Sequence, residues 1–156
     1  MIRKLISGGQ TGADSCIIAV GKRLGIPTGG QVPRGWQTER GPKPGLQQLG
    51  FTESESTDYA VRTRQNVEQS DATLIFAVNP DSDGTRLTVD HAKKIGKPCL
   101  VVNPFEPGAN DSVTPWLCAK KPAVLNVAGN RESKAPGIAS QAEKVLYAAL
   151  SLPGAD

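Results

Sequence analysis

A glycine-rich segment close to the N-terminus, Ser7–Asp14 (SGGQTGAD), limits the possible folds of this chain more than any other stretch. It follows the apolar pair Leu5-Ile6 and precedes residues 16–20 (CIIAV), which have a helical pattern. The segment is therefore predicted to turn a first strand into a first helix. Glycine lets the backbone approach a ligand closely, and a helix N-terminus offers unpaired N–H groups with a partial positive charge. Together these features favour binding of an anionic group, most often a phosphate.

Strand and helix patterns alternate along the rest of the chain. Apolar stretches predict strands at 2–6, 26–30, 72–78, 99–102 and 124–127. Helical patterns are found at 12–24, at 59–70, from the end of the 79–85 turn to about residue 95, and at 138–150. The alternation predicts an α/β fold: a single Rossmann-like domain over residues 1–156, with a mainly parallel sheet and helices on both faces.

Residues 31–50 contain three prolines and four glycines, and we expect a long loop there without a helix. A short extended piece is expected at 51–56, and Ser112 or Thr114 is expected to begin a short helix that runs through Leu117. Long loops inside compact domains are often functional.

Several residues have the character of helix ends. Gly25 is expected to end the first helix in the usual C-terminal role of glycine. Thr57 or Asp58 can cap the helix that begins near residue 59, and Asp83 or Thr85 can cap the helix after the 79–85 turn.

The composition excludes several classes of protein. Lysine and arginine number 18 against 15 acidic residues, a net charge of +3, without a basic run or an aromatic platform, so nucleic-acid binding is not expected. No apolar run is long enough to span a bilayer and no signal peptide precedes the first strand, so we expect a cytoplasmic protein without membrane contact. Three cysteines without a C-x-x-C pair argue against a disulfide framework and against a zinc site.

Four turns are predicted to lie on one rim, because ligands of parallel α/β sheets bind at the carboxyl ends of the strands. These turns are residues 7–12, 29–35, 79–85 and 128–133. The candidate ligand-binding residues on or beside them are Gly8, Gly9, Gln10, Thr11, Gly12, Arg34, Gly84, Thr85, Arg86, Thr88 and Arg131. Alternatives stay open for three of them: Arg34 and Arg86 as solvated charges, and Arg131 as a surface pair with Glu132 or a subunit contact.

The residues that could carry catalysis are few. His91, the only histidine, is predicted to lie in the middle of a helix, and Cys16 and Cys99 are predicted to be core residues, so none of the three is an expected catalytic group. Asp14 could act as a general base, but charge compensation at the start of the first helix explains it more simply. We therefore assign no catalytic residue and no metal ligand. Of Arg62 and Arg64, at most one can face the rim, because residues i and i+2 of a helix diverge.

The first turn lacks the sequence features of a dinucleotide-binding site. Its glycines do not have the G-x-G-x-x-G spacing, and no Gly-Lys-Ser/Thr follows. A ribose-binding acid should end the second strand, but that place has Gly29-Gly30-Gln31 with Arg34 beyond. Ordinary NAD binding is therefore disfavoured.

Taken together, the turns resemble the molybdenum cofactor carrier proteins. The resemblance lies in SGGQTGAD at 7–14, GGxxPRG at 29–35, YxxRTxxNV at 59–67, SDATLI at 70–75 and GNRES at 129–133. It implies a Rossmann-like homotetramer that binds molybdenum cofactor, a molybdopterin with a phosphate and a molybdenum-oxo centre, and protects it. In such a carrier the cofactor is cargo, and the protein is not an enzyme. The first turn would hold the phosphate or another oxyanion, and Arg34 and the Gly84-Thr85 turn would line the same crevice.

The same resemblance implies protein partners and also suggests alternative functions. Apo-molybdoenzymes or cofactor-biosynthesis proteins would be the protein partners. The broader Rossmann group includes the misnamed lysine decarboxylases and their phosphoribohydrolase branch, which cleaves nucleoside monophosphates and has a glutamate soon after a Gly-Gly-x-Gly-Thr turn. Here Gly84-Thr85 is followed by Arg86-Leu87-Thr88, without that acid, which favours a binder. A nucleotide-sensing module is the third hypothesis.

Overall fold

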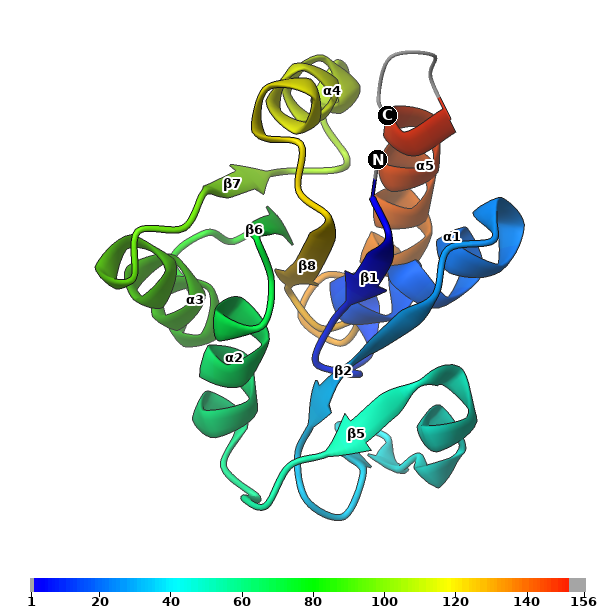
Figure 1. Ribbon diagram of the computed structural model, residues 1–156, viewed down its shortest axis with the longest axis vertical. Coiled ribbons are helices and arrows are strands. Elements are labelled where there is room, and N and C mark those ends of the chain that lie inside the picture. The colour runs from blue at the N-terminus through cyan, green and yellow to red at the C-terminus, as the bar shows by residue number, and fades with distance from the viewer. Residues whose placement is uncertain (1, 152–156) are drawn as a thin grey trace.

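Six parallel strands form the central sheet of the computed structural model, which describes residues 2–151 (Figure 1). Their order across the sheet is β5-β2-β1-β8-β6-β7. The bounds are Lys4–Ile6 for β1, Thr28–Val32 for β2, Phe51–Glu53 for β5, Ala72–Phe76 for β6, Cys99–Val102 for β7 and Val124–Gly129 for β8. The Rossmann-like fold class predicted from the sequence is confirmed; residues 1 and 152–156 of the predicted domain lie outside the described residues.

The strand order reverses beside β1, which lies between β2 and β8. Ile6 at the carboxyl end of β1 pairs with Gly29 of β2 and with Asn126 of β8. The chain first extends the sheet on one side, through β2 and β5, and then crosses to build β6 and β7 on the other side. Such a reversal leaves a crevice outside the carboxyl ends of the strands, and the turn Ser7–Asp14 lies there.

Helices cover both faces of the sheet (Figure 1). On one face, α1 (Cys16–Leu24) and α4 (Ala109–Lys120) both pack against α5 (Ile138–Ser151). On the other face, α2 (Tyr59–Glu68) packs against α3 (Asp83–Lys94). The side chains between these layers are mainly aliphatic, and the largest fully buried ones include Leu5, Ile17, Leu74, Phe76, Leu125, Ile138 and Leu146.

The prediction of a helix-free loop at 31–50 is wrong. A 3-10 helix, η2, spans Pro44–Leu49, and an antiparallel hairpin precedes it, formed by β3 (Gln37–Thr38) and β4 (Gly41–Pro42). Proline is tolerated at a first helical position because it needs no N–H partner there. Leu46 is buried in the core, and Gly50 ends the helix in the left-handed region at φ 92°.

Two other helix starts also differ from prediction. α4 begins at Ala109, before Ser112 and Thr114, because Ala109, Val113 and Leu117 bury one continuous helical stripe. Ser82 caps α3, in place of Asp83 or Thr85: its side chain accepts a hydrogen bond from Thr85 N at 3.4 Å.

Other predicted ends are confirmed. Asp58 caps α2 by accepting from Ala60 N at 2.9 Å, and Gly25 ends α1 at φ 69°. The first helix begins as a short 3-10 segment, η1 (Gly12–Ser15), before it continues as α1. Among the helices within residues 2–151, none is long and apolar enough to cross a membrane.

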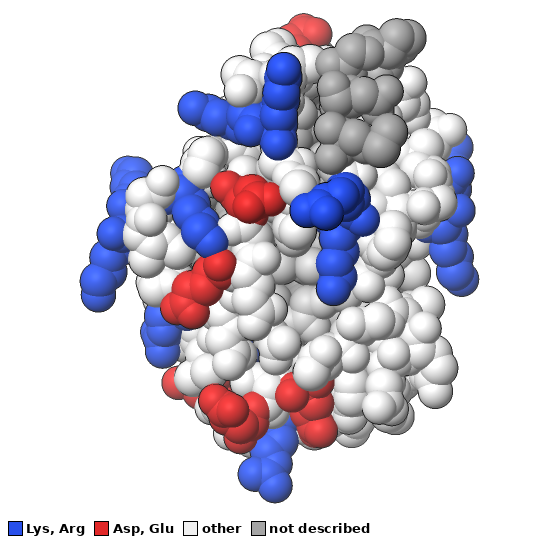
Figure 2. Space-filling view, viewed as in Figure 1, with Lys and Arg blue, Asp and Glu red and all other residues white. Residues whose placement is uncertain are grey.

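Charged side chains are distributed widely over the surface. On the face viewed in Figure 2, lysine and arginine side chains are spread over several small groups, and acidic side chains lie between some of these groups. Surface charge on this face therefore does not mark a binding site, and the basic residues relevant to binding are those at the carboxyl ends of the strands.

Candidate functional site

A cavity of about 590 Å³ opens at the carboxyl ends of the strands, on the face covered by α2 and α3. Its volume lies within the range typical of small-molecule sites. Four groups of residues line it: Gly8, Gln10 and Asp14 after β1; Tyr59, Ala60, Arg62, Thr63 and Asn66 on α2; Asn79, Ser82, Asp83, Gly84, Thr85, Leu87 and Thr88 around the start of α3; and Asn126, Ala128, Gly129, Asn130, Arg131 and Lys134 on β8 and beyond.

The cavity brings together predicted residues from three of the four rim turns. Those that line it are Gly8, Gln10, Gly84, Thr85, Thr88 and Arg131. The 29–35 turn does not contribute to the lining. The arrangement agrees with the expectation that separate turns would meet at the strand ends.

The remaining predicted residues lie outside the lining, and their roles as ligand contacts stay predictions. Arg34 is exposed, and its backbone N–H donates to Ser56 O at 2.8 Å. Arg86 is exposed and forms a surface pair with Asp81 at 3.9 Å. The other three predicted residues shape the first turn and its contacts with the rest of the chain: Gly9, Thr11 and Gly12.

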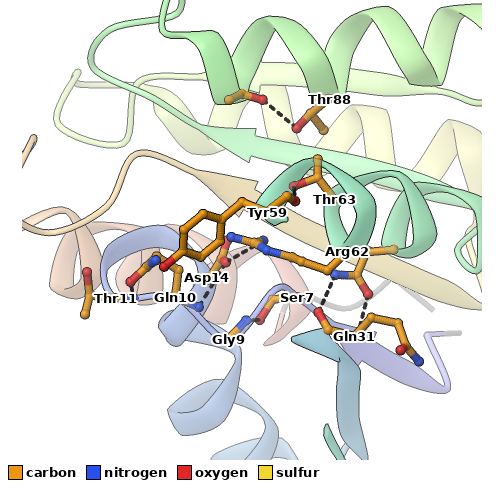
Figure 3. A network of polar contacts seen from close by, with 12 residues as sticks. Ser7, Gly9, Gln10, Thr11, Asp14, Gln31, Tyr59, Arg62, Thr63 and Thr88 are labelled. Carbon is orange, nitrogen blue, oxygen red and sulfur yellow. Dashed lines mark hydrogen bonds and ion pairs between the residues drawn. The ribbon is translucent and has the colours of Figure 1, made fainter. Parts of the chain in front are cut away.

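An ion pair between Arg62 and Asp14 forms one wall of the cavity (Figure 3). Arg62 Nη1 lies 3.3 Å from Asp14 Oδ2, and the two side chains are only 12% and 5% exposed. Gln10 N also donates to Asp14 Oδ2, at 3.1 Å. Of the two arginines that sequence spacing left open, Arg62 lines the cavity and Arg64 does not.

Burial raises the pKa of Asp14 above its ordinary value of 3.8, although the Arg62 guanidinium and the Gln10 N–H oppose the rise. Because the folded-state pKa exceeds the unfolded one, the folded protein binds this proton more tightly. The resulting stabilisation is fully present below pH 3.8 and is lost as the pH rises through the folded-state pKa.

The upward shift of the Asp14 pKa predicts how Asp14→Asn changes the pH dependence of stability. Asparagine does not titrate, so the free energy of unfolding of the wild type should fall relative to that of the variant by up to about 1.4 kcal/mol per pH unit between the two pKa values. Urea unfolding of both proteins from pH 3 to pH 7 measures the difference. A wild type that instead gains stability over the variant with rising pH would contradict the assignment.

Two buried nitrogens of the lining have no hydrogen-bond partner within residues 2–151. They are Gln10 Nε2 and Arg62 Nε. Buried donors are rarely left unpaired in folded proteins, because each unpaired donor costs free energy. Both nitrogens are donors and neither can accept, so only a hydrogen-bond acceptor can pair with them.

The lining of the cavity has more cationic than acidic side chains. The Arg62 and Arg131 guanidinium carbons lie 5.5 and 5.8 Å from the centre of the Tyr59 ring, which is 37% exposed. Lys134 also lines the cavity. The N-terminus of α3 adds a partial positive charge. Of the two acidic side chains in the lining, Asp14 is paired with Arg62 and Asp83 lies at the start of α3. The balance favours an anionic ligand.

Asn130 is a structural residue of the site that sequence reasoning did not single out. Its Oδ1 accepts from Val78 N at 2.8 Å and from Asn79 N at 3.1 Å, and its Nδ2 donates to Asn79 O at 3.3 Å. These bonds fix the segment that leads into α3. Asparagine in a turn is compatible with such a role, but partners more than fifty residues away leave no pattern in the sequence.

The Glu39 carboxylate connects the first turn to the turn after β8, and the Glu132 carboxylate connects that turn to the start of α5. Thr11 Oγ1 and Ser133 N donate to Glu39 Oε2, the latter at 3.3 Å. Desolvation alone would raise the pKa of Glu39, but the hydrogen bonds from Ser133 and Thr11 outweigh it and hold this pKa below its ordinary value of 4.5. The Glu132 carboxylate accepts from Gly137 N at 2.5 Å and Ala139 N at 3.1 Å, at the start of α5.

The other titratable candidates lie away from the cavity lining. His91 is half-buried, and its Nε2 lies 3.1 Å from Glu68 Oε1. Burial raises the pKa of the Cys16 thiol, and it raises the pKa of Cys99 to about 11. Within residues 2–151, no group of three or more histidine, cysteine, aspartate or glutamate side chains is placed to hold a metal ion.

Comparison with known proteins agrees with this architecture. The model of a family described as the circularly permutated YpsA SLOG family matches residues 5–150. The chain is 36% identical to a protein from Syntrophus aciditrophicus whose crystal structure is described as that of a "putative molybdenum carrier protein". The two structures align with a TM-score of 0.88 over 96% of each chain. No curated protein matches the chain.

Proposed function

The chain belongs to the circularly permuted YpsA SLOG family, and we propose that it is a non-enzymatic carrier that binds, protects and transfers molybdenum cofactor. The observation that carries the proposal is the match to a putative molybdenum carrier over 96% of each chain, combined with a cavity lined by Arg62, Arg131 and Lys134. The cofactor is cargo in this proposal and supplies its own chemistry to a recipient enzyme.

The lining suits the anionic groups of this cargo. Molybdopterin carries a phosphate, and its molybdenum centre carries oxo ligands. Arg131, Lys134 and the N-terminus of α3 all line the cavity, and their positive charge favours a phosphate. Gln10 Nε2 and Arg62 Nε are two unpaired donors on side chains of the lining, and they suit oxygen or ring-nitrogen acceptors.

A carrier requires only that the cavity bind the cargo and limit its contact with water. The runner-up function, hydrolysis of nucleoside monophosphates, needs a carboxylate to stabilise charge developing on the ribose. Asp14, the buried carboxylate of the lining, is held by Arg62 and Gln10 N. No acid follows Gly84-Thr85 closely in the sequence, which supports a binder over a hydrolase.

The resemblance to the carrier family also motivates three further parts of this proposal. The protein assembles as a homotetramer, acts in the cytoplasm, and delivers the cofactor to apo-molybdoenzymes or receives it from cofactor-biosynthesis proteins. Light scattering of the purified protein measures the assembly.

Protection of freshly released cofactor tests the proposed function. Cofactor released from a purified molybdoenzyme is incubated in air with the protein, and the fraction that still reconstitutes an apo-molybdoenzyme is followed over time. The expected result is a slower decay than in buffer or with an unrelated protein. Decay at the same rate would refute a protective carrier, and release of free base from nucleoside monophosphates would establish the hydrolase instead.

A further inference from the structure

Two backbone N–H groups hold the side-chain amide of Gln10 in one orientation. Thr11 N donates to Gln10 Oε1 at 3.0 Å, and Glu39 N donates to the same oxygen at 2.9 Å. Only the oxygen of an amide side chain accepts such bonds, so the network assigns Nε2 to the opposite side. Gln10 is 5% exposed and lines the cavity, and its Nε2 has no partner within residues 2–151.

One of those N–H groups belongs to Glu39, which lies between β3 and β4 and outside the cavity lining. The Glu39 carboxylate accepts from Thr11 Oγ1 and from Ser133 N. The Thr11 hydroxyl in turn accepts from Glu132 N at 3.1 Å. Glu39 therefore fastens the β3–β4 hairpin to the first turn and to the turn after β8 at the same time.

We propose that Glu39 is a positioning residue for the cavity: its carboxylate holds the hairpin against the Ser7–Asp14 turn, so that the Glu39 N–H keeps Gln10 Nε2 directed at the ligand. The ligand group received by Nε2 is an acceptor, such as an anionic oxygen or a ring nitrogen. Without the carboxylate, the hairpin loses its side-chain link to Thr11, and the Gln10 amide loses the support of Glu39 N and keeps only the bond from Thr11 N. The identity of the cargo rests on the proposed function, but the geometry does not.

A double-mutant cycle tests whether Glu39 acts through Gln10. Dissociation constants are measured for wild type, Gln10→Ala, Glu39→Ala and the double variant, with anaerobically released molybdopterin, inorganic phosphate and AMP as separate probes. Each single variant should bind the probe about tenfold more weakly, the loss expected for one hydrogen bond to a charged group. The double variant should bind no more weakly than Gln10→Ala, because the two changes remove the same contact.

Three controls separate positioning from a general loss of structure. Glu39→Gln keeps an oxygen that can accept from Thr11 and Ser133, so it should retain affinity within about threefold of wild type. Glu53→Ala removes a carboxylate that binds the segment just before the hairpin, through Gly35 N at 2.5 Å, and should leave affinity unchanged. Urea unfolding verifies that each variant is folded.

Failure of this inference and failure of the proposed function give different results. Additive losses in the double variant, or a Glu39→Ala variant with wild-type affinity, would overturn the positioning role. If the wild type binds phosphate or AMP but not molybdopterin, the carrier function is refuted and the cycle is completed with the probe that binds. A wild type that binds none of the three probes overturns both proposals.

Discussion

Replacement of Arg62 by methionine is expected to weaken binding of molybdenum cofactor by about 100-fold and to reduce the free energy of unfolding by about 3 kcal/mol at neutral pH. The variant loses the guanidinium donors in the cavity wall and leaves the Asp14 carboxylate buried without its partner. Isolated charges in a protein interior are strongly unfavourable, so Asp14 would take up a proton at a higher pH than in the wild type.

Two companion variants separate the effect on binding from the effect on stability. Arg64→Met lies on the same helix but outside the cavity lining, and both its affinity and its stability should remain close to wild type. Adding Asp14→Asn to Arg62→Met removes the unpaired charge, which should restore most of the stability without restoring affinity. Urea unfolding and a cofactor titration measure the two quantities, and wild-type affinity in the double variant would exclude Arg62 from the site.

Gly129→Ala is expected to be the most destabilising single-methyl change at the site, at about 4 kcal/mol. Gly129 has φ 148°, a region that other residues rarely adopt. A Cβ there would lie 1.9 Å from Phe76 O and 2.7 Å from Ala13 Cβ. Because Gly129 pairs with Phe76 in the β6–β8 ladder, the clash would force apart the two strands that end beneath the cavity.

The matched control is Gly45→Ala, whose new Cβ would meet no atom within 4 Å and whose backbone is not in the left-handed region. For a chain of this size, 4 kcal/mol corresponds to a fall in Tm of roughly 8–16 °C. Thermal unfolding followed by circular dichroism measures both variants. A Gly129→Ala variant as stable as Gly45→Ala would contradict the close packing of β6, β8 and the first turn.

The sequence predicts the sheet better than the segments that connect it. The apolar run at 72–78 predicted β6 because a strand buried on both faces needs nothing from distant residues to be identified. The 3-10 helix at Pro44–Leu49 was missed because its proline and glycines signal a loop, and the burial of Leu46 that stabilises it is a tertiary effect. The early start of α4 has the same kind of cause, in the packing of Ala109.

The candidate site was predictable only where it follows from topology. Strand ends place Gln10, Thr85 and Arg131 around one cavity, as the parallel-sheet argument expected. The contacts that orient these residues join distant parts of the chain. Arg62 and Asp14 are separated by 48 positions, and the bond from Ser133 to Glu39 spans 94 positions. No spacing rule reaches that far, so these partners required the structure.

Whether the cavity holds the cofactor is decided by the pterin that remains bound after gel filtration of wild type, Gly84→Trp and Gly45→Trp. Gly84 lines the cavity and Gly45 does not, and at both positions a new side chain would begin in open space. Wild type and Gly45→Trp should each retain pterin in proportion to protomer, and Gly84→Trp should retain none because indole obstructs the cavity. Equal retention by the two tryptophan variants, or none by the wild type, would contradict a cofactor-binding cavity.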